Sequence, residues 1–171
     1  MDLQDIKTPG LSCDLHDNPD IKERELALSH KILMSVEKPA RYIGGESGSV
    51  IKDKEKVSVR FAFCFPDSYD IGMSHLGMKI LYSLTNQRED YWCERVFAPG
   101  TDFEEIMRRE NIPLYAIESL DPVKDFDFIG FTMQYELSYT NVLNMLDLAG
   151  LPVFAKDRGC LLYTSDAADD R

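Results

Sequence analysis

Val57-Ser-Val-Arg-Phe-Ala-Phe-Cys-Phe65 is the stretch of sequence that decides the fold. It is rich in β-branched and aromatic residues and is followed at once by Pro66-Asp67, a combination that predicts a buried strand ending in a turn. Ser74 is the expected N-cap of the helix that comes next. The apolar residues that share one face of this helix are Leu76, Ile80, Leu81 and Leu84.

Strands and helices continue to alternate along the chain. We expect further strands at Trp92–Phe97, Phe126–Met133 and Leu151–Ala155, with helices starting near Asp102 and Ser138. Gly150 closes the second of these helices, and Pro152 stands just beyond it. Such repetition implies parallel pairing through right-handed crossovers. The sequence therefore predicts an α/β fold with a doubly wound, mostly parallel, Rossmann-like sheet.

The short apolar run Leu114–Ile117 does not follow this alternation. About eight residues separate it from the strand beginning at Phe126, and a parallel crossover needs roughly a dozen or more. We interpret this run as an edge or antiparallel addition to the sheet.

Residues 1–52 form a different kind of segment, with a polar arm, a helix and a glycine-rich linker. Asp20-Ile-Lys-Glu23 resembles a capping box, and Leu28, Ile32 and Val36 recur every four residues before Pro39. Arg41–Ser49 is rich in turn residues. We therefore expect an N-terminal helix, then a turn-rich link, then the α/β domain over residues 53–158.

Composition excludes several classes of protein. The 171 residues are 44% hydrophobic and carry a net charge of -11, so phosphate-rich nucleic acid is not expected as the main partner. The chain has neither an apolar run long enough to span a membrane nor a signal peptide at its start. We expect a cytoplasmic protein without a membrane partner.

The four cysteines argue against a compact metal site. They stand at positions 13, 64, 93 and 160, and none forms a C-x-x-C pair. Cys64 lies inside the first strand and is expected to be a buried free thiol. Cys13 and His16 are two possible metal ligands on the arm, but two more would have to come from distant positions.

The last residues differ in character from the rest. Cys-Leu-Leu-Tyr-Thr-Ser-Asp-Ala-Ala-Asp-Asp-Arg, residues 160–171, resembles the in-frame translation of a sequencing adapter. A genuine polar tail is the alternative. We treat residues 159–171 as non-native, which leaves a net charge of -9, and we expect an N-terminal fragment whose sheet is incomplete at its C-terminal end.

Six residues are candidates for facing a ligand. In an open parallel sheet, ligands bind beyond the carboxyl ends of the strands. Two loops that contain polar residues are expected at this edge. The candidates are Asp67, Ser68 and His75 after the first strand, and Thr132, Gln134 and Glu136 at and beyond the end of the strand predicted at Phe126–Met133.

Each candidate also has a purely structural interpretation. Asp67 is placed to interact with a helix dipole, His75 to cap a helix, and Gln134 and Glu136 to join a satisfied polar network. Dinucleotide and Walker-type phosphate motifs are missing, and no catalytic residues can be assembled from the spacing.

Four stretches together resemble the N-terminal region of cobalamin-binding-type radical S-adenosylmethionine (radical SAM) proteins. The longest runs from Gly130 to Gly150, and another runs from Phe61 to Gly77. The others are Val36–Glu46 and Cys93–Pro99, so the likeness covers about residues 30–158.

The resemblance implies a cobalamin-binding or flavodoxin-like domain placed before a radical SAM barrel. A C-x-x-x-C-x-x-C triad would hold a [4Fe–4S] cluster in that barrel, and this sequence lacks the triad. The expected partners are the missing radical SAM domain and an unknown substrate, and the resemblance implies that this region helps to position either cobalamin or that substrate. The loop lacks Asp-x-His-x-x-Gly, so a histidine ligand to cobalt is not expected. The alternative is a non-catalytic, receiver-like module that binds a protein partner.

Overall fold

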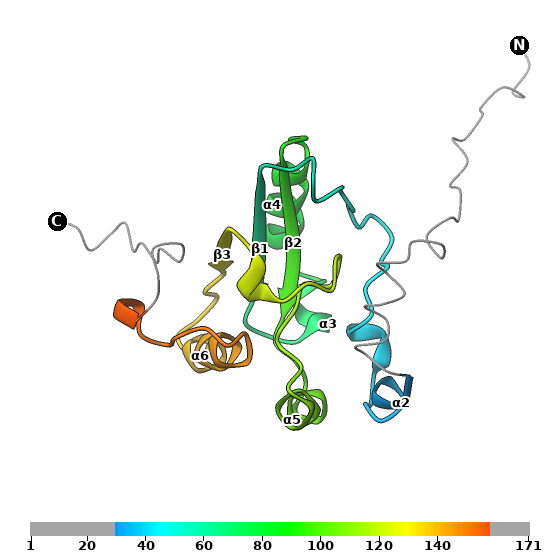
Figure 1. Ribbon diagram of the computed structural model, residues 1–171, viewed down its shortest axis with the longest axis vertical. Coiled ribbons are helices and arrows are strands. Elements are labelled where there is room, and N and C mark those ends of the chain that lie inside the picture. The colour runs from blue at the N-terminus through cyan, green and yellow to red at the C-terminus, as the bar shows by residue number, and fades with distance from the viewer. Residues whose placement is uncertain (1–29, 158–171) are drawn as a thin grey trace, which may run out of the picture.

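The computed structural model describes residues 30–157 (Figure 1). Its single sheet contains β1 (Val59–Phe65), β2 (Tyr91–Phe97) and β3 (Phe128–Phe131) in the order β2-β1-β3. Both pairings are parallel. The predicted α/β fold with a parallel sheet is therefore confirmed, although β3 is shorter than the strand expected from the sequence.

Helices follow each of the three strands. The α-helices are α2 (His30–Leu33), α3 (Tyr69–Gly72), α4 (Leu76–Asn86), α5 (Thr101–Glu110) and α6 (Ser138–Leu148). The single-turn 3-10 helices are η2 (Pro39–Arg41), η3 (Val123–Asp125) and η4 (Ala155–Asp157). In Figure 1, α4 runs alongside β1 and β2, whereas α5 and α6 lie near the ends of the strands.

Two apolar cores pack on opposite faces of the sheet. Successive side chains of a strand point to opposite faces, so Cys64 belongs to one core and Phe63 to the other. We call these the Cys64 face and the Phe63 face. The Cys64 face packs with α5, α6 and buried side chains from residues 114–126, while the Phe63 face packs with α4. Helices on both faces are the expected doubly wound arrangement.

The face that α4 turns toward the sheet is not the predicted one. Met78 and Tyr82 are buried, at 1% and 6% exposure. The side chain of Asn86 bonds to both the N–H and the carbonyl of Cys93, at 3.0 and 2.9 Å, and this pair fixes the rotation of the helix. The predicted apolar face is instead exposed: Leu76, Ile80, Leu81 and Leu84.

The strand expected at Leu151–Ala155 does not form, so this prediction was wrong. Gly150, with a φ of 69°, ends α6 as expected. The Leu151 N–H then bonds back to the Leu146 carbonyl, and Pro152 has no N–H to donate. The chain turns into η4, and Phe154 is exposed. The open edge near this region belongs to β3.

Only part of the predicted N-terminal helix can be compared with the structure. Helix α2 ends at Leu33, before Pro39 as expected, and Val36 is buried although it lies beyond the helix. The capping box at residues 20–23, the possible ligands Cys13 and His16, and the tail at residues 159–171 lie outside the described residues.

Substitutions on α4 will distinguish its buried face from its exposed face. Met78→Ala removes a fully buried side chain and is expected to lower the free energy of unfolding by about 2–5 kcal/mol. Leu81→Ala, on the half-exposed flank of the same helix, is expected to cost less than about 1 kcal/mol. Urea denaturation followed by circular dichroism will measure both. Equal losses would contradict this orientation of α4.

Candidate functional site

The carboxyl ends of the three strands are joined by backbone and amide hydrogen bonds around the turn after β1. The Ala98 N–H, just after β2, donates to the Asp67 carbonyl at 3.1 Å. On the other side, the Thr132 N–H donates to the Cys64 carbonyl at 3.1 Å. The side-chain amide of Asn141 in α6 donates to the Pro66 carbonyl at 2.8 Å. Because chain order reverses between β1 and β3, this edge is where open α/β sheets bind ligands.

Asp67 and Ser68 follow β1 but play different parts. The Oδ1 of Asp67 accepts the N–H of Ser68 at 2.7 Å, so this carboxylate stabilises its own turn. Ser68 is the N-cap of α3, yet its hydroxyl makes no capping bond. It lines a cavity of about 30 Å³ at the end of β2, with room for a single water molecule.

His75 caps α4. Its Nδ1 accepts the N–H of Met78 at 3.2 Å, and its ring lies 5.3 Å from the ring of Phe65. A neutral imidazole that accepts at Nδ1 carries its proton on Nε2. In this arrangement neither nitrogen of His75 has a lone pair free to bind a metal.

The three candidates after β3 differ in exposure. The Oγ1 of Thr132 is buried and has no hydrogen-bond partner within the described residues. Gln134 and Glu136 are exposed on the loop that leads to α6. The structure therefore places Asp67 and Thr132 on either side of the carboxyl end of β1. Ser68 faces the β2 side, and the ring of His75 lies beside Phe65 at the end of β1.

A buried ionic cluster at the outer edge of β2 was not predicted. The Nε of Arg95 lies 2.6 Å from Glu118, and the Arg95 N–H bonds to the same carboxylate at 2.7 Å. The Glu94 carboxylate, on the opposite face, accepts the N–H of Ser119 at 3.0 Å and pairs with Arg60 of β1 at 2.5 Å. We call residues 117–119 with Glu94 and Arg95 the β2 clasp. The signal for it was two adjacent charges inside an otherwise apolar strand.

The clasp also explains the short run Leu114–Ile117. The Ile117 N–H bonds to the Arg95 carbonyl at 2.9 Å, and Tyr115 makes an isolated antiparallel bridge with Pro122. This run is therefore an irregular edge element rather than a fourth strand.

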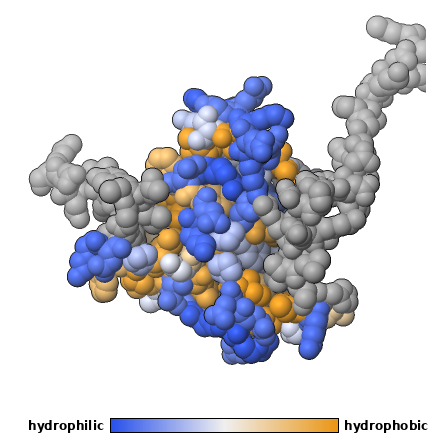
Figure 2. All heavy atoms as spheres, viewed as in Figure 1, coloured by the Kyte–Doolittle hydropathy of each residue, from blue (hydrophilic) through white to orange (hydrophobic). Residues whose placement is uncertain are grey.

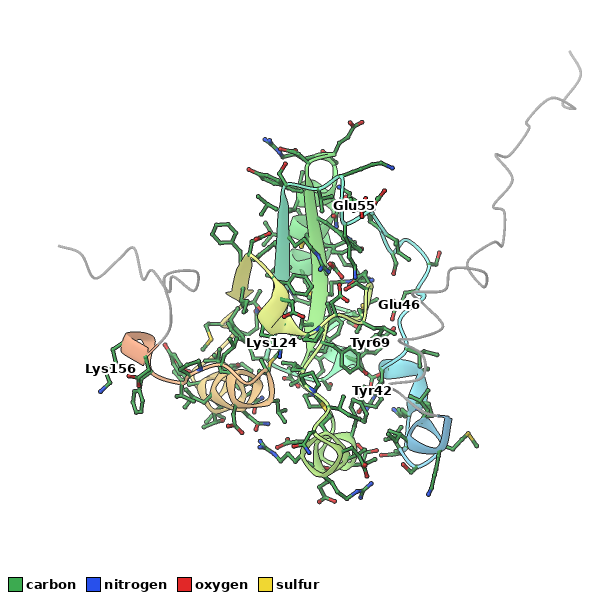
Figure 3. The ribbon with its side chains drawn as sticks, viewed as in Figure 1. Tyr42, Glu46, Glu55, Tyr69, Lys124 and Lys156 are labelled. Carbon is green, nitrogen blue, oxygen red and sulfur yellow. The ribbon has the colours of Figure 1, made fainter. Side chains whose placement is uncertain are left out.

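The glycine-rich link is anchored to the domain along its length. Glu46 accepts the hydroxyl of Tyr69 at 2.9 Å, and both side chains are labelled in Figure 3. Burial and this bond raise the pKa of Tyr69 to about 12. Ser49 accepts from Arg95 at 2.9 Å. At Gly44, whose φ is 67°, a Cβ atom would lie 2.0 Å from the Ile117 carbonyl oxygen, so only glycine fits there.

The described residues contain no metal centre of the usual kind. No three His, Cys, Asp or Glu side chains of residues 30–157 gather into a metal-binding group. Cys64 and Cys93 are free and buried, as expected for Cys64. No helix in this range is long and apolar enough to cross a membrane.

One comparison with known proteins gives a match to part of the chain. Residues 77–161 match the family model described as radical SAM proteins, N-terminal. The match supports a radical SAM family protein, as the resemblance implied. No curated protein and no solved structure matches the chain.

The cap at His75 can be tested by two substitutions. His75→Ala removes the acceptor for the Met78 N–H and is expected to cost about 1 kcal/mol of stability. His75→Asn keeps a side-chain acceptor and is expected to retain most of it. Urea midpoints of the two variants give the comparison. If both variants lose the same stability, packing against Phe65 rather than capping is the role of the ring.

The clasp makes stability depend on pH in a defined direction. Burial raises the pKa of Glu118 to about 7, although Arg95 opposes this shift. A raised pKa means that the folded protein binds the Glu118 proton more tightly than the unfolded protein does, and this difference stabilises the folded state. The stabilisation is complete below the pKa of the unfolded state, near 4.5, and is lost as pH rises through about 7. Relative to Glu118→Gln, the wild type is therefore expected to lose stability between pH 5 and 8. Urea midpoints of both proteins over this range would contradict the shift if their difference stayed constant.

Proposed function

We propose that this region is the N-terminal, cobalamin-binding-like domain of a cytoplasmic radical SAM enzyme, and that it positions a corrinoid or substrate for the parent's radical SAM domain. The family match supports the radical SAM part of this proposal. One observation carries the ligand-binding part, namely the buried hydroxyl of Thr132, which lacks a partner among the described residues beside the β1–β3 reversal. A buried hydroxyl without a partner is costly, and a bound ligand can supply that partner.

The residues present fit a corrinoid held by its periphery rather than through its metal. Thr132, Gln134 and Glu136 offer hydrogen-bonding groups beside β3. Ser68 faces the cavity on the β2 side, which has room for one water molecule, and is not part of this contact. His75 uses Nδ1 for the cap of α4, so coordination of cobalt by this histidine is not part of the proposal. When bound, a corrinoid supplies a cobalt centre for group transfer.

We assign no catalytic residue to this region. The 171 residues contain no C-x-x-x-C-x-x-C triad, so the [4Fe–4S] cluster and S-adenosylmethionine belong to the rest of the parent protein in this proposal. The role of the residues described here is to bind and orient.

A second candidate, a receiver-like module that binds a protein, rests on the apolar side chains that α4 leaves exposed. A receiver needs a cluster of free carboxylates after the first strand and an acceptor aspartate after the third. Asp67 instead holds its own turn, and Thr132 stands at the end of β3. The corrinoid proposal therefore ranks first.

We also propose that residues 159–171 are not native. The support is the likeness of Cys160–Arg171 to a translated sequencing adapter. Sequencing the source DNA across this point tests the proposal, since native codons there would differ from the adapter. An uninterrupted genomic frame that encodes the same residues would overturn it.

Titration of hydroxocobalamin into the parent protein tests the proposed function. We expect a shifted corrin absorption spectrum, and about five- to tenfold weaker binding for Thr132→Val, which loses one hydrogen bond of about 1 kcal/mol. Thr132→Ser keeps the hydroxyl and is the matched control. If the parent protein leaves the spectrum unchanged, the corrinoid proposal fails and the protein-binding module becomes the better explanation.

A further inference from the structure

A cavity on the Phe63 face lies between α4, the turn that precedes it and the glycine-rich link. Its volume is about 330 Å³, within the size range of small-molecule sites. The buried side chains of Arg95, Tyr82 and Met78 form its floor. None of the six candidate residues predicted from the sequence lines this space. The cavity therefore differs from the candidate site beside β3.

The rim of the cavity comes from the link and from α4. The residues that line it there are exposed and polar or small: Ser47, Gly48, Lys79 and Ser83. The link turns at this point, since the Ser49 N–H bonds to the Glu46 carbonyl at 3.0 Å and Gly48 has a φ of 85°. Arg95 holds the turn by donating to the Ser49 hydroxyl at 2.9 Å. The cavity thus has a buried floor and a polar rim that is fixed on the side of the link.

The charged side chains that line the cavity are two cations, Arg95 and Lys79. Glu46 and Glu118 pair with Arg95, but neither is among the described residues that line the space. A partly enclosed site with two cations and no carboxylate in its walls favours a negatively charged ligand.

The guanidinium of Arg95 has one nitrogen without a strong acceptor. Its Nε lies 2.6 Å from Glu118, and its Nη2 donates to Ser49. Among the described residues, its Nη1 contacts only the sulfur of Met73, at 3.2 Å. A thioether is a weak acceptor on a flexible side chain. A negatively charged oxygen is a much stronger partner for this buried donor.

Lys79 also lacks a partner of opposite charge, unlike several other cations of the domain. Figure 2 shows that the end of the molecule where β1 begins is hydrophilic. The cations of the loops that lead into β1 and β2 there, Lys54, Lys56 and Arg88, each pair with an aspartate at 2.5–2.9 Å. Lys79 pairs with no carboxylate of residues 30–157. Its ammonium group is therefore available to a ligand.

We propose that this cavity binds a small organic anion. The oxyanion of the ligand accepts hydrogen bonds from Arg95 and Lys79, and its apolar part packs against Met73 and Met78, which also line the cavity. The chemistry recognised is a phosphate or carboxylate group on an apolar body. The inference does not depend on the proposed function, since it uses none of the residues assigned to the corrinoid.

Titration of three small probes into the isotope-labelled chain tests the proposal by NMR. Phenyl phosphate and benzoate carry an oxyanion on an aromatic body, and benzyl alcohol is the neutral control. We expect the amide signals of Gly48 and Ser83 to shift with at least one of the two anions, with a Kd of about 1 mM or lower, and not with benzyl alcohol. The anion that binds more tightly identifies the group that the cavity takes. No shift with either anion, or an equal shift with benzyl alcohol, would overturn the proposal.

A matched pair of substitutions tests the role of the rim cation. Lys79→Gln keeps most of the side chain but removes its charge, and is expected to weaken binding of the tighter anion about three- to tenfold. Lys124→Gln removes the same charge from η3, which packs on the Cys64 face, and is expected to leave binding unchanged. Both lysines are exposed, so neither substitution is expected to alter the Tm. Equal weakening by the two variants reports net charge alone and contradicts the proposal, as does an unchanged affinity of Lys79→Gln.

These results can be separated from a failure of the proposed function. Thr132→Val alters the candidate site beside β3 and is expected to leave binding of the anions unchanged. If Thr132→Val weakens this binding and Lys79→Gln does not, the anion binds beside β3 and the cavity is not its site. If the present chain binds the anion while the parent protein leaves the corrin spectrum unchanged, only the corrinoid proposal fails.

Discussion

Two ion pairs on adjacent residues of β2 are the constraint on which the rest of the structure depends. Glu94 points to the Cys64 face and pairs with Arg60, whereas Arg95 points to the Phe63 face and pairs with Glu118. The Glu94 and Glu118 side chains are fully buried. Removing one partner of such a pair leaves an uncompensated buried charge, a cost of about 3–5 kcal/mol. Residues 117–119 are therefore held around the edge of β2.

This constraint makes the two edges of the sheet different. With the β2 edge closed, the sheet is open only beside β3, and the reversal of strand order lies between β1 and β3. The same cluster holds the glycine-rich link through Ser49, so a segment that reads as a flexible connector packs against the domain. The candidate ligand site thus lies near the one side of the sheet that is open to further chain.

Local patterns predicted β1, β2 and β3 and their parallel pairing, because β1 and β2 are dense in apolar and aromatic residues. The orientation of α4 could not be read from its own sequence, since it depends on two bonds between Asn86 and the distant Cys93. Leu151–Ala155 was predicted as a strand because its residues are apolar, but no strand of the described residues pairs with it. At the site, the expected end of the third strand was enough to predict Thr132 as a candidate. Asn141, which donates to the Pro66 carbonyl, lies inside a helix, and no sequence pattern pointed to it.

The two buried cysteines have a practical consequence. Cys64 and Cys93 stand on neighbouring strands but on opposite faces of the sheet, so they cannot form a disulfide within the folded domain. Burial raises the pKa of both thiols, that of Cys93 to about 12. The thiolate needed for alkylation is therefore scarce while the sheet is intact. The rate at which a thiol reagent modifies each of these two cysteines therefore reports how often one particular face of the sheet opens, and no cysteine has to be introduced for the measurement.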